Sequence, residues 1–256
     1  MHYYTHEGQP RHFVPMTSRP DEMRPTRTTD AKKHGWVPSV TTVMNVLAKP
    51  ALVNWKVSQH VQMAYQLNPA DYETCDDWLK AVSRATETEM DKAPDAGTNI
   101  HNMLEAHFLC EDYPDEYRDL CNKVVAVVEE KTGLGQDHFL PEQRFAHDSG
   151  YAGMCDLSSY GSIPWVIDYK TKQTADKFKP GKMAYPDHSR QLAAYREGLG
   201  IPNARCANVF ICIENGEIDF HEHKESDLQK GWGTFKDSLA IWQRENFDTS
   251  FKKETE

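Results

Sequence analysis

The stretch that decides the fold is GYAGMCDLSSYGSIPWVIDYK, which runs from Gly150 to Lys170. It contains two short apolar runs, Tyr151–Tyr160 and Ile163–Tyr169, separated by a turn at Gly161-Ser162. Two apolar runs of strand length joined by a short glycine-containing turn are typical of a β-hairpin. The sequence therefore predicts two paired strands at this place.

Three charged side chains mark this hairpin: Asp156 in its first strand, and Asp168 and Lys170 in its second. Residues two apart in a strand point to the same face, so Asp168 and Lys170 share one. Pairing of the strands brings Asp156 beside Asp168. Two adjacent carboxylates repel each other unless a proton or a cation joins them. Mg²⁺ commonly binds one or two carboxylates together with a substrate phosphate.

The lysine completes a chemically useful set. An ammonium group near two carboxylates can position or deprotonate a water molecule, or neutralise charge that develops on a phosphate. The alternative interpretation is a solvated strand edge, because an Asp-x-Lys sequence at the end of a strand often arises by chance. The three residues alone do not decide between the two.

Two predicted helices carry further polar side chains. Residues 187–199, DHSRQLAAYREGL, have helical periodicity, and Gln191 and Tyr195 lie one turn apart on one face. Residues 97–109, GTNIHNMLEAHFL, form a second predicted helix that carries His101. Taken alone, each helix is typical of a structural element with a polar face.

Taken in chain order, these pieces resemble a known family. The order is G-x-x-x-H on a helix, an acid after GYAG, D-x-K, and Q-x-x-x-Y on a helix. This order is similar to that of the RecB-like nucleases of the PD-(D/E)xK superfamily, above all the mitochondrial genome maintenance and phage-type exonucleases. The resemblance spans residues 38–199 and includes VPSVTTVMNVLAKPALVNWK near its start. Cys155 stands where the superfamily pattern has proline, and the acid of D-x-K is Asp168 rather than Glu.

The resemblance implies roles for individual residues. Lys170 would be the catalytic lysine, Asp156 and Asp168 would be metal ligands, and the main-chain carbonyl of Tyr169 would add a ligand. His101 would be the histidine that RecB-like nucleases add to the metal site. Because a nitrogen ligand suits Mn²⁺ better than Mg²⁺, we expect Mn²⁺ to support activity at least as well as Mg²⁺.

Four more side chains are assigned with alternatives. Glu142, on the preceding predicted strand, would hold a water on the metal or a second metal, or would be a surface glutamate. Glu105, one turn from His101, would orient its ring or be unrelated to it. Gln191 and Tyr195 would contact the phosphate or position the lysine, or would only pack their helix.

The segment after Lys170 is rich in cations, with Lys172, Lys177, Lys179, Lys182 and Arg190. We interpret Lys172, Lys179, Lys182 and Arg190 as a nucleic-acid-binding track, against the simpler interpretation of a solvated face. His221 and His223 alternate on a later predicted strand. Since no further zinc ligands are evident, we expect both to be solvated.

The arrangement of predicted elements indicates an α/β fold. Residues 36–135 are mainly helical, with a break at Pro94-Asp95, and residues 136–250 contain five strands, at 138–147, 151–160, 163–169, 205–213 and 217–223, with helices at 187–199 and 226–247. We expect a mixed central sheet flanked by helices, the restriction-endonuclease-like core that the resemblance implies. Residues 1–35 are predicted to be a polar basic arm that is flexible or touches nucleic-acid phosphates, and residues 36–250 a single nuclease domain.

Composition limits the classes of function. The 256 residues carry a net charge of −10, which argues against a protein that simply coats nucleic acid. The first residues have no apolar core segment, so we expect no secretory signal and a cytoplasmic location, in a bacterium or a phage-infected cell. None of the six cysteines forms C-x-x-C, so we expect reduced thiols and no iron–sulfur cluster.

The resemblance thus implies a Mg²⁺- or Mn²⁺-dependent DNA exonuclease that acts on single-stranded ends and leaves 5′-phosphates. Recombination, repair, genome degradation and defence stay open as its role. A single-strand-binding or recombination protein is the expected partner, and no membrane contact is expected. Three alternatives stay open: a structure-specific endonuclease, a nuclease-fold module that binds without cleaving, and a metal hydrolase of small phosphate compounds.

Overall fold

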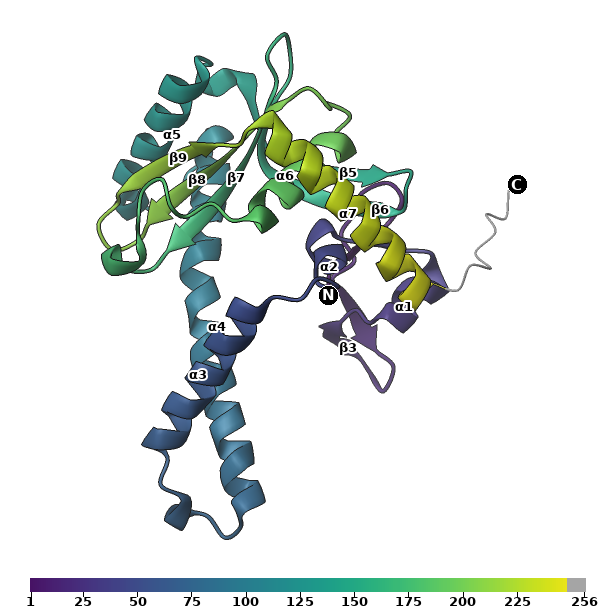
Figure 1. Ribbon diagram of the computed structural model, residues 1–256, viewed down its shortest axis with the longest axis vertical. Helices are drawn as coiled ribbons and strands as arrows, with labels where there is room; N and C mark the ends of the chain where they lie inside the picture. Colours follow the sequence, from purple (N-terminus) through teal and green to yellow (C-terminus); the bar gives the residue numbers. More distant parts are fainter. Residues whose placement is uncertain (248–256) are drawn as a thin grey trace. The chain divides into compact units, whose positions relative to one another are not determined.

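The computed structural model describes residues 1–247, with the backbone alone at residue 51 and at residues 90–96. Two compact units can be distinguished along the chain (Figure 1). One comprises residues 1–46 and the chain from Met103 onward, and the other comprises residues 47–102. This division differs from the expected one, 1–35 and 36–250, and the number of independently folding domains stays a prediction.

The first unit is built on a five-stranded mixed sheet. Its strands are β5 (Phe139–His147), β6 (Tyr151–Ser159), β7 (Trp165–Lys172), β8 (Arg205–Cys212) and β9 (Ile218–Glu222). They lie in the order β5-β6-β7-β8-β9, and only β7 and β8 run parallel. The predicted mixed sheet flanked by helices is therefore confirmed, as is the hairpin of β6 and β7.

The positions of the strands in the sheet are consistent with the burial of their side chains. The run RCANVFIC in β8 is buried from Cys206 to Cys212, as a central strand covered on both faces must be. The parallel β7 and β8 need a crossover, which α6 (Pro186–Gly198) supplies. The ladder between β6 and β7 ends at the pair Leu157–Ile167, so the two strands separate before they reach Asp156 and Asp168.

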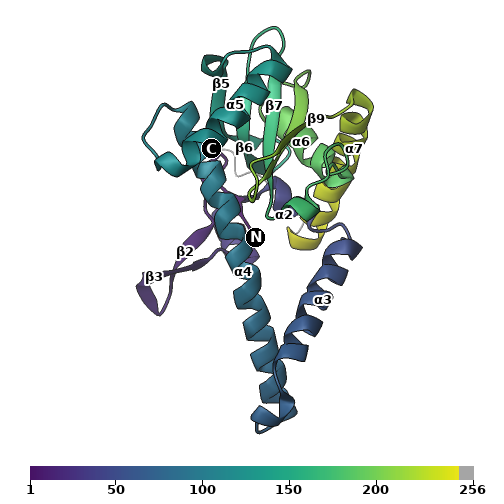
Figure 2. The same ribbon diagram turned by 90° about the vertical axis from the view of Figure 1, so that its left-hand side faces the viewer.

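Helices cover both faces of this sheet, as Figure 2 shows. On one face α6 packs against the sheet and against α7 (Glu225–Asn246), around the fully buried Leu192 and Phe235. The Arg196 guanidinium, on α6, binds the Glu225 carboxylate at the start of α7 at 2.8 Å. On the other face lies α5 (Arg118–Thr132), whose Val124 and Val128 are buried.

The first 38 residues, most of which were expected to be an arm, are folded in the structure. They form β1 (Tyr3–Tyr4), β2 (Phe13–Met16), β3 (Arg19–Pro25), α1 (Thr28–His34) and β4 (Val37–Pro38), and α2 (Val40–Met44) follows. The Tyr3 side chain is fully buried against Ala31 and Trp242. Arg24 donates two hydrogen bonds to the Asp30 carboxylate, and these hold the pKa of Asp30 well below its usual value. The polar composition of the segment does not predict these few anchoring contacts.

The second unit is helical, as predicted. It contains α3 (Pro50–Gln66), a short 3₁₀ turn at Pro69–Asp71 and most of α4 (Cys75–Phe108). The expected break at Pro94 is wrong, because α4 continues through that residue. Among residues 1–247, no helix combines the length and apolar character needed to span a bilayer.

Candidate active site

The predicted acids and lysine meet where β6 and β7 separate. The Asp156 carboxylate Oδ2 accepts a hydrogen bond of 2.7 Å from the backbone N–H of Tyr169, the residue between Asp168 and Lys170. This carboxylate oxygen replaces the carbonyl that the strand ladder would have supplied. The bond places the Asp156 side chain against the D-x-K sequence, as the hairpin predicted.

Asp168 and Lys170 form a close ion pair. The Lys170 Nζ lies 2.7 Å from the Asp168 Oδ2, and Asp168 is only 2% exposed. Burial lowers the pKa of the Lys170 ammonium, but the charges of Asp168 and Asp156 and the hydrogen bond to Asp168 more than offset this, so its pKa lies above the usual value. Lys170 is therefore a cation at neutral pH. It is equipped to donate hydrogen bonds and offset negative charge rather than to accept a proton.

The helix α6 extends this arrangement. Lys170 Nζ donates to the side-chain oxygen of Gln191 at 3.2 Å, and the Gln191 amide donates to the Tyr195 hydroxyl at 2.8 Å. Gln191 and Tyr195 thus share a face, as their spacing predicted. Burial raises the pKa of Tyr195 well above its usual value, and the charges of Asp168 and Asp156 add to the effect. The phenol is neutral, and its position is consistent with holding Gln191 against the lysine.

Two residues that sequence analysis did not assign complete the surroundings of Asp168. Asn208, fully buried on β8, lies opposite Asp168 in the parallel register and donates to its Oδ2 at 2.7 Å. The Asn208 side-chain oxygen is in turn 2.7 Å from His223 Nε2. A lone amide inside the apolar run of β8 was the signal that could have indicated Asn208.

The expectation that His223 is solvated is wrong. Its ring is 7% exposed, just beyond the end of β9, and it is held by Asn208. Burial, with a smaller contribution from the nearby His221, lowers the pKa of His223 to about 4. The residue is therefore a neutral imidazole at pH 7. The two-residue spacing of His221 and His223 does not predict whether the His223 ring is buried, because this depends on how neighbouring elements pack against it.

The donor chemistry at this place fits a hard divalent cation. Asp156 and Asp168 supply carboxylate oxygens from neighbouring strands, and Mg²⁺ commonly takes one or two carboxylates from a protein and its other ligands from water and substrate. Within the described part of the chain, no three or more His, Cys, Asp or Glu side chains are grouped so as to hold a metal ion. The wider ligand set with His101, Glu142 and the Tyr169 carbonyl stays a prediction.

The other predicted ligands occupy different elements. Glu142 is half-buried on β5, level with Asp156 in the strand register, and has a positive φ of 50°. A non-glycine residue in this conformation is strained, and such strain often occurs at functional sites. His101 lies on α4 within the unit of residues 47–102, and Glu105 follows one turn later in the other unit.

The predicted phosphate-binding cations lie beyond β7. Lys172 ends β7, and Lys179 and Lys182 are exposed in the segment before α6. Burial lowers the pKa of Lys172, and the charges of Lys170 and Lys177 add to the effect. Arg190, on α6, donates from Nη1 to the Asp187 carboxylate at 2.5 Å. The role of these cations as a track stays a prediction.

Comparison with known proteins gives distant structural matches only. No family model matches the chain, and no curated protein matches it. A solved putative exonuclease from Eubacterium rectale is similar over 59% of this chain and 67% of its own, at 11% identity and a TM-score of 0.41. The protein SSO0001 is similar at 15% identity and a TM-score of 0.28; the match covers 49% of this chain and 58% of the SSO0001 chain. Both TM-scores and both sequence identities are low.

Proposed function

We propose that this protein is a Mg²⁺- or Mn²⁺-dependent nuclease that hydrolyses phosphodiester bonds. The observation that carries the proposal is the placement of Lys170 between the Asp168 carboxylate and Gln191, with the Asp156 carboxylate held on the intervening backbone N–H of Tyr169. Two carboxylates and a half-buried ammonium group on adjacent strands match the needs of phosphoryl chemistry better than those of a solvated strand edge.

Each side chain has a task in this proposal. Asp156 and Asp168 would hold the divalent cation. When bound, such a cation lowers the pKa of a water molecule and polarises a phosphoryl oxygen. The Lys170 ammonium donates a hydrogen bond to the attacking water or to a phosphate oxygen and offsets negative charge in the transition state. Gln191 and Tyr195 keep the lysine in place, and Asn208 keeps the Asp168 carboxylate oriented.

The finer proposal is an exonuclease acting on DNA from single-stranded ends and leaving 5′-phosphates. Its support is the resemblance in the order of motifs, from His101 through Asp156 and Asp168 to Tyr195. The cations Lys172, Lys179 and Lys182 supply local positive charge in a chain whose net charge is −10. Because this charge is local, we expect affinity for DNA to fall steeply with salt.

The test compares end-labelled single-stranded DNA with a covalently closed circle of the same sequence. Each is incubated with Mg²⁺, Mn²⁺ or EDTA, with wild type and with Lys170→Met. We expect loss of the linear strand alone, dependent on metal and abolished by Lys170→Met, and the labelled end gives the polarity. Cleavage of the circle would favour an endonuclease. Retained binding without cleavage of either DNA would refute a deoxyribonuclease.

The matched control is Lys236→Met, which removes an exposed lysine from α7, away from the carboxylates. It changes net charge as Lys170→Met does. We therefore expect it to retain cleavage, so that a loss in Lys170→Met reports on the position of the ammonium group rather than on total charge.

A further inference from the structure

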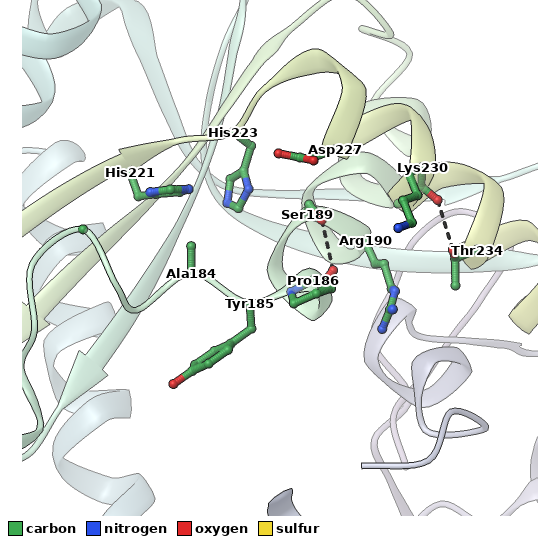
Figure 3. A pocket seen from close by; sticks show the side chains of 12 residues that line it. Ala184, Tyr185, Pro186, Ser189, Arg190, His221, His223, Asp227, Lys230 and Thr234 are labelled. Carbon is green, nitrogen blue, oxygen red and sulfur yellow. Dashed lines mark hydrogen bonds between the residues drawn. The ribbon is translucent and has the colours of Figure 1, made fainter. Parts of the chain in front are cut away.

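A pocket of about 350 Å³ lies between the start of α6, the end of β9 and the first turns of α7 (Figure 3). Its volume falls within the range of small-ligand sites, which is roughly 300–1,000 Å³. The wall includes Arg190 from α6, Lys230 from α7 and the ring of Tyr185, with His223 behind them. No part of the proposed chemistry uses Lys230 or Tyr185.

Two cations face this space. Arg190 uses Nη1 to bind Asp187, which leaves further N–H groups of its guanidinium to donate elsewhere. Lys230 forms no ion pair among the side chains that the structure describes. Asp227 is the one carboxylate in the wall, and it is exposed. Two cations that line one pocket, in a chain with an excess of acids, indicate a site for an anion, and a guanidinium together with an ammonium suits a phosphate.

The pocket also offers an aromatic surface. Tyr185 is 57% exposed, and in the view of Figure 3 its ring lies on the side of the pocket away from Arg190 and Lys230. An exposed ring next to a phosphate site can stack on a nucleobase, an interaction worth about 1–3 kcal/mol for each base. A pocket for a free phosphate ion would need neither this ring nor this volume.

Hydrogen bonds connect the pocket wall to the candidate catalytic centre. His223 lines the pocket and binds the Asn208 side chain, which donates to the Asp168 carboxylate. Only two side chains therefore separate the pocket from the carboxylate that would hold the cation. The pocket therefore adjoins the hydrogen-bonded network that holds the Asp168 carboxylate.

We propose that this pocket binds one nucleotide of a single strand next to the scissile phosphate, with its phosphate on Arg190 and Lys230 and its base against Tyr185. This assignment rests on the proposed nuclease function for the identity of the strand. It adds a binding site, and hence a contribution to affinity that does not require the cation.

The test is metal-free binding, measured in EDTA by fluorescence anisotropy of a labelled 12-mer oligothymidylate across a salt series. The variants are Lys230→Met, Tyr185→Ala and the control Lys236→Met. Each phosphate contact of a single strand contributes about 0.7 to the slope of log K against log salt. We expect Lys230→Met to reduce that slope by about 0.7, and Lys236→Met to leave it unchanged. Tyr185→Ala should weaken binding at least fivefold without changing the slope.

Equal slopes for Lys230→Met and Lys236→Met would overturn the assignment, as would the absence of metal-free binding by the wild type. Since Lys230 is exposed, the variant is expected to fold, and its far-ultraviolet circular dichroism checks this. A slope that depends on Lys230 in a protein that cleaves no DNA would refute the nuclease function and leave the nucleotide pocket standing. The two proposals can therefore fail separately.

Discussion

The contact between α6 and α7 depends on a glycine. A Cβ atom added at Gly231 of α7 would lie 2.9 Å from the Ser189 carbonyl oxygen and 3.0 Å from the Arg190 backbone nitrogen. Ordinary van der Waals contact begins near 3.4 Å, so Gly231→Ala requires the two backbones to separate by about 0.5 Å. Neither neighbour is a flexible side chain that could move away. The change therefore acts on the position of α6 itself, which carries Gln191.

The cost can be estimated from two opposing effects. Forcing an extra carbon into a packed contact costs about 1–3 kcal/mol. Alanine in place of glycine within a helix returns about 0.5–1 kcal/mol. We expect Gly231→Ala to lower the free energy of unfolding by about 0–2.5 kcal/mol, the difference of these two ranges. The same shift of α6 should move Gln191 relative to Lys170 and lower the rate of DNA cleavage at saturating metal.

Gly233 provides the control, because it lies in the same helix and a Cβ there would meet nothing within 4 Å. Gly233→Ala should stabilise the protein by about 0.4–1 kcal/mol, the gain from reduced freedom of the unfolded chain. Urea unfolding followed by circular dichroism at 222 nm measures both variants. If the Gly231→Ala variant were as stable as the Gly233→Ala variant, the close contact between α6 and α7 at Gly231 would be refuted.

Three further outcomes follow from the same geometry. Asn208→Leu should lower the free energy of unfolding in urea by about 1–3 kcal/mol, since it leaves the buried His223 nitrogen unpaired. The same change should slow DNA cleavage but keep metal-free strand binding, and unchanged cleavage would contradict the role given to Asn208. The His223 pKa is about 4 in the folded protein and near 6.5 in the unfolded chain, so the unfolded state binds the proton first. His223 therefore contributes a loss of stability of about 1.4 kcal/mol per pH unit from pH 6.5 down to about 4, in addition to the losses from His12 and His188, whose folded-state pKa values are also lowered. His223→Gln should reduce the slope of stability against pH by that amount, and an unchanged slope would refute the shift. Gly198→Ala should destabilise the protein by about 1–3 kcal/mol, because its Cβ would overlap the Phe145 ring. Adding Phe145→Leu makes room for this Cβ and should recover part of the lost stability, measured by thermal unfolding.

Local patterns made the hairpin predictable. Two apolar runs with a turn between them were enough to predict that Asp156 lies against the strand that carries Asp168 and Lys170. The contact of Lys170 with Gln191 was not predictable in the same way, because it depends on how the crossover helix packs on the sheet. Helical spacing predicted that Gln191 and Tyr195 share a face of the helix, but it could not predict which residues that face contacts.

The errors have physical causes of the same kind. Residues 1–35 were expected to form an arm because they are polar and rich in proline and arginine, whereas in the structure a fully buried Tyr3 and the Arg24–Asp30 ion pair anchor the segment. His223 was expected in solvent because strand alternation does not indicate which face is later covered. The folding of residues 1–35 and the burial of His223 both depend on contacts between residues distant in sequence, which composition and periodicity do not predict.

The Asp168 carboxylate links these observations, because its oxygen Oδ2 accepts from Lys170 and from Asn208 at 2.7 Å each. Lys170 is held from α6 through Gln191, and Asn208 is bound to His223 at the end of β9. A shift of either element therefore changes the direction of one carboxylate. This arrangement explains why perturbations in the helix contact at Gly231 and in the buried amide at Asn208 should both slow the reaction, although neither residue would touch the phosphate. It also implies that the two effects are not additive: with Asn208→Leu already present, Gly231→Ala should reduce cleavage by a smaller factor than it does in the wild type.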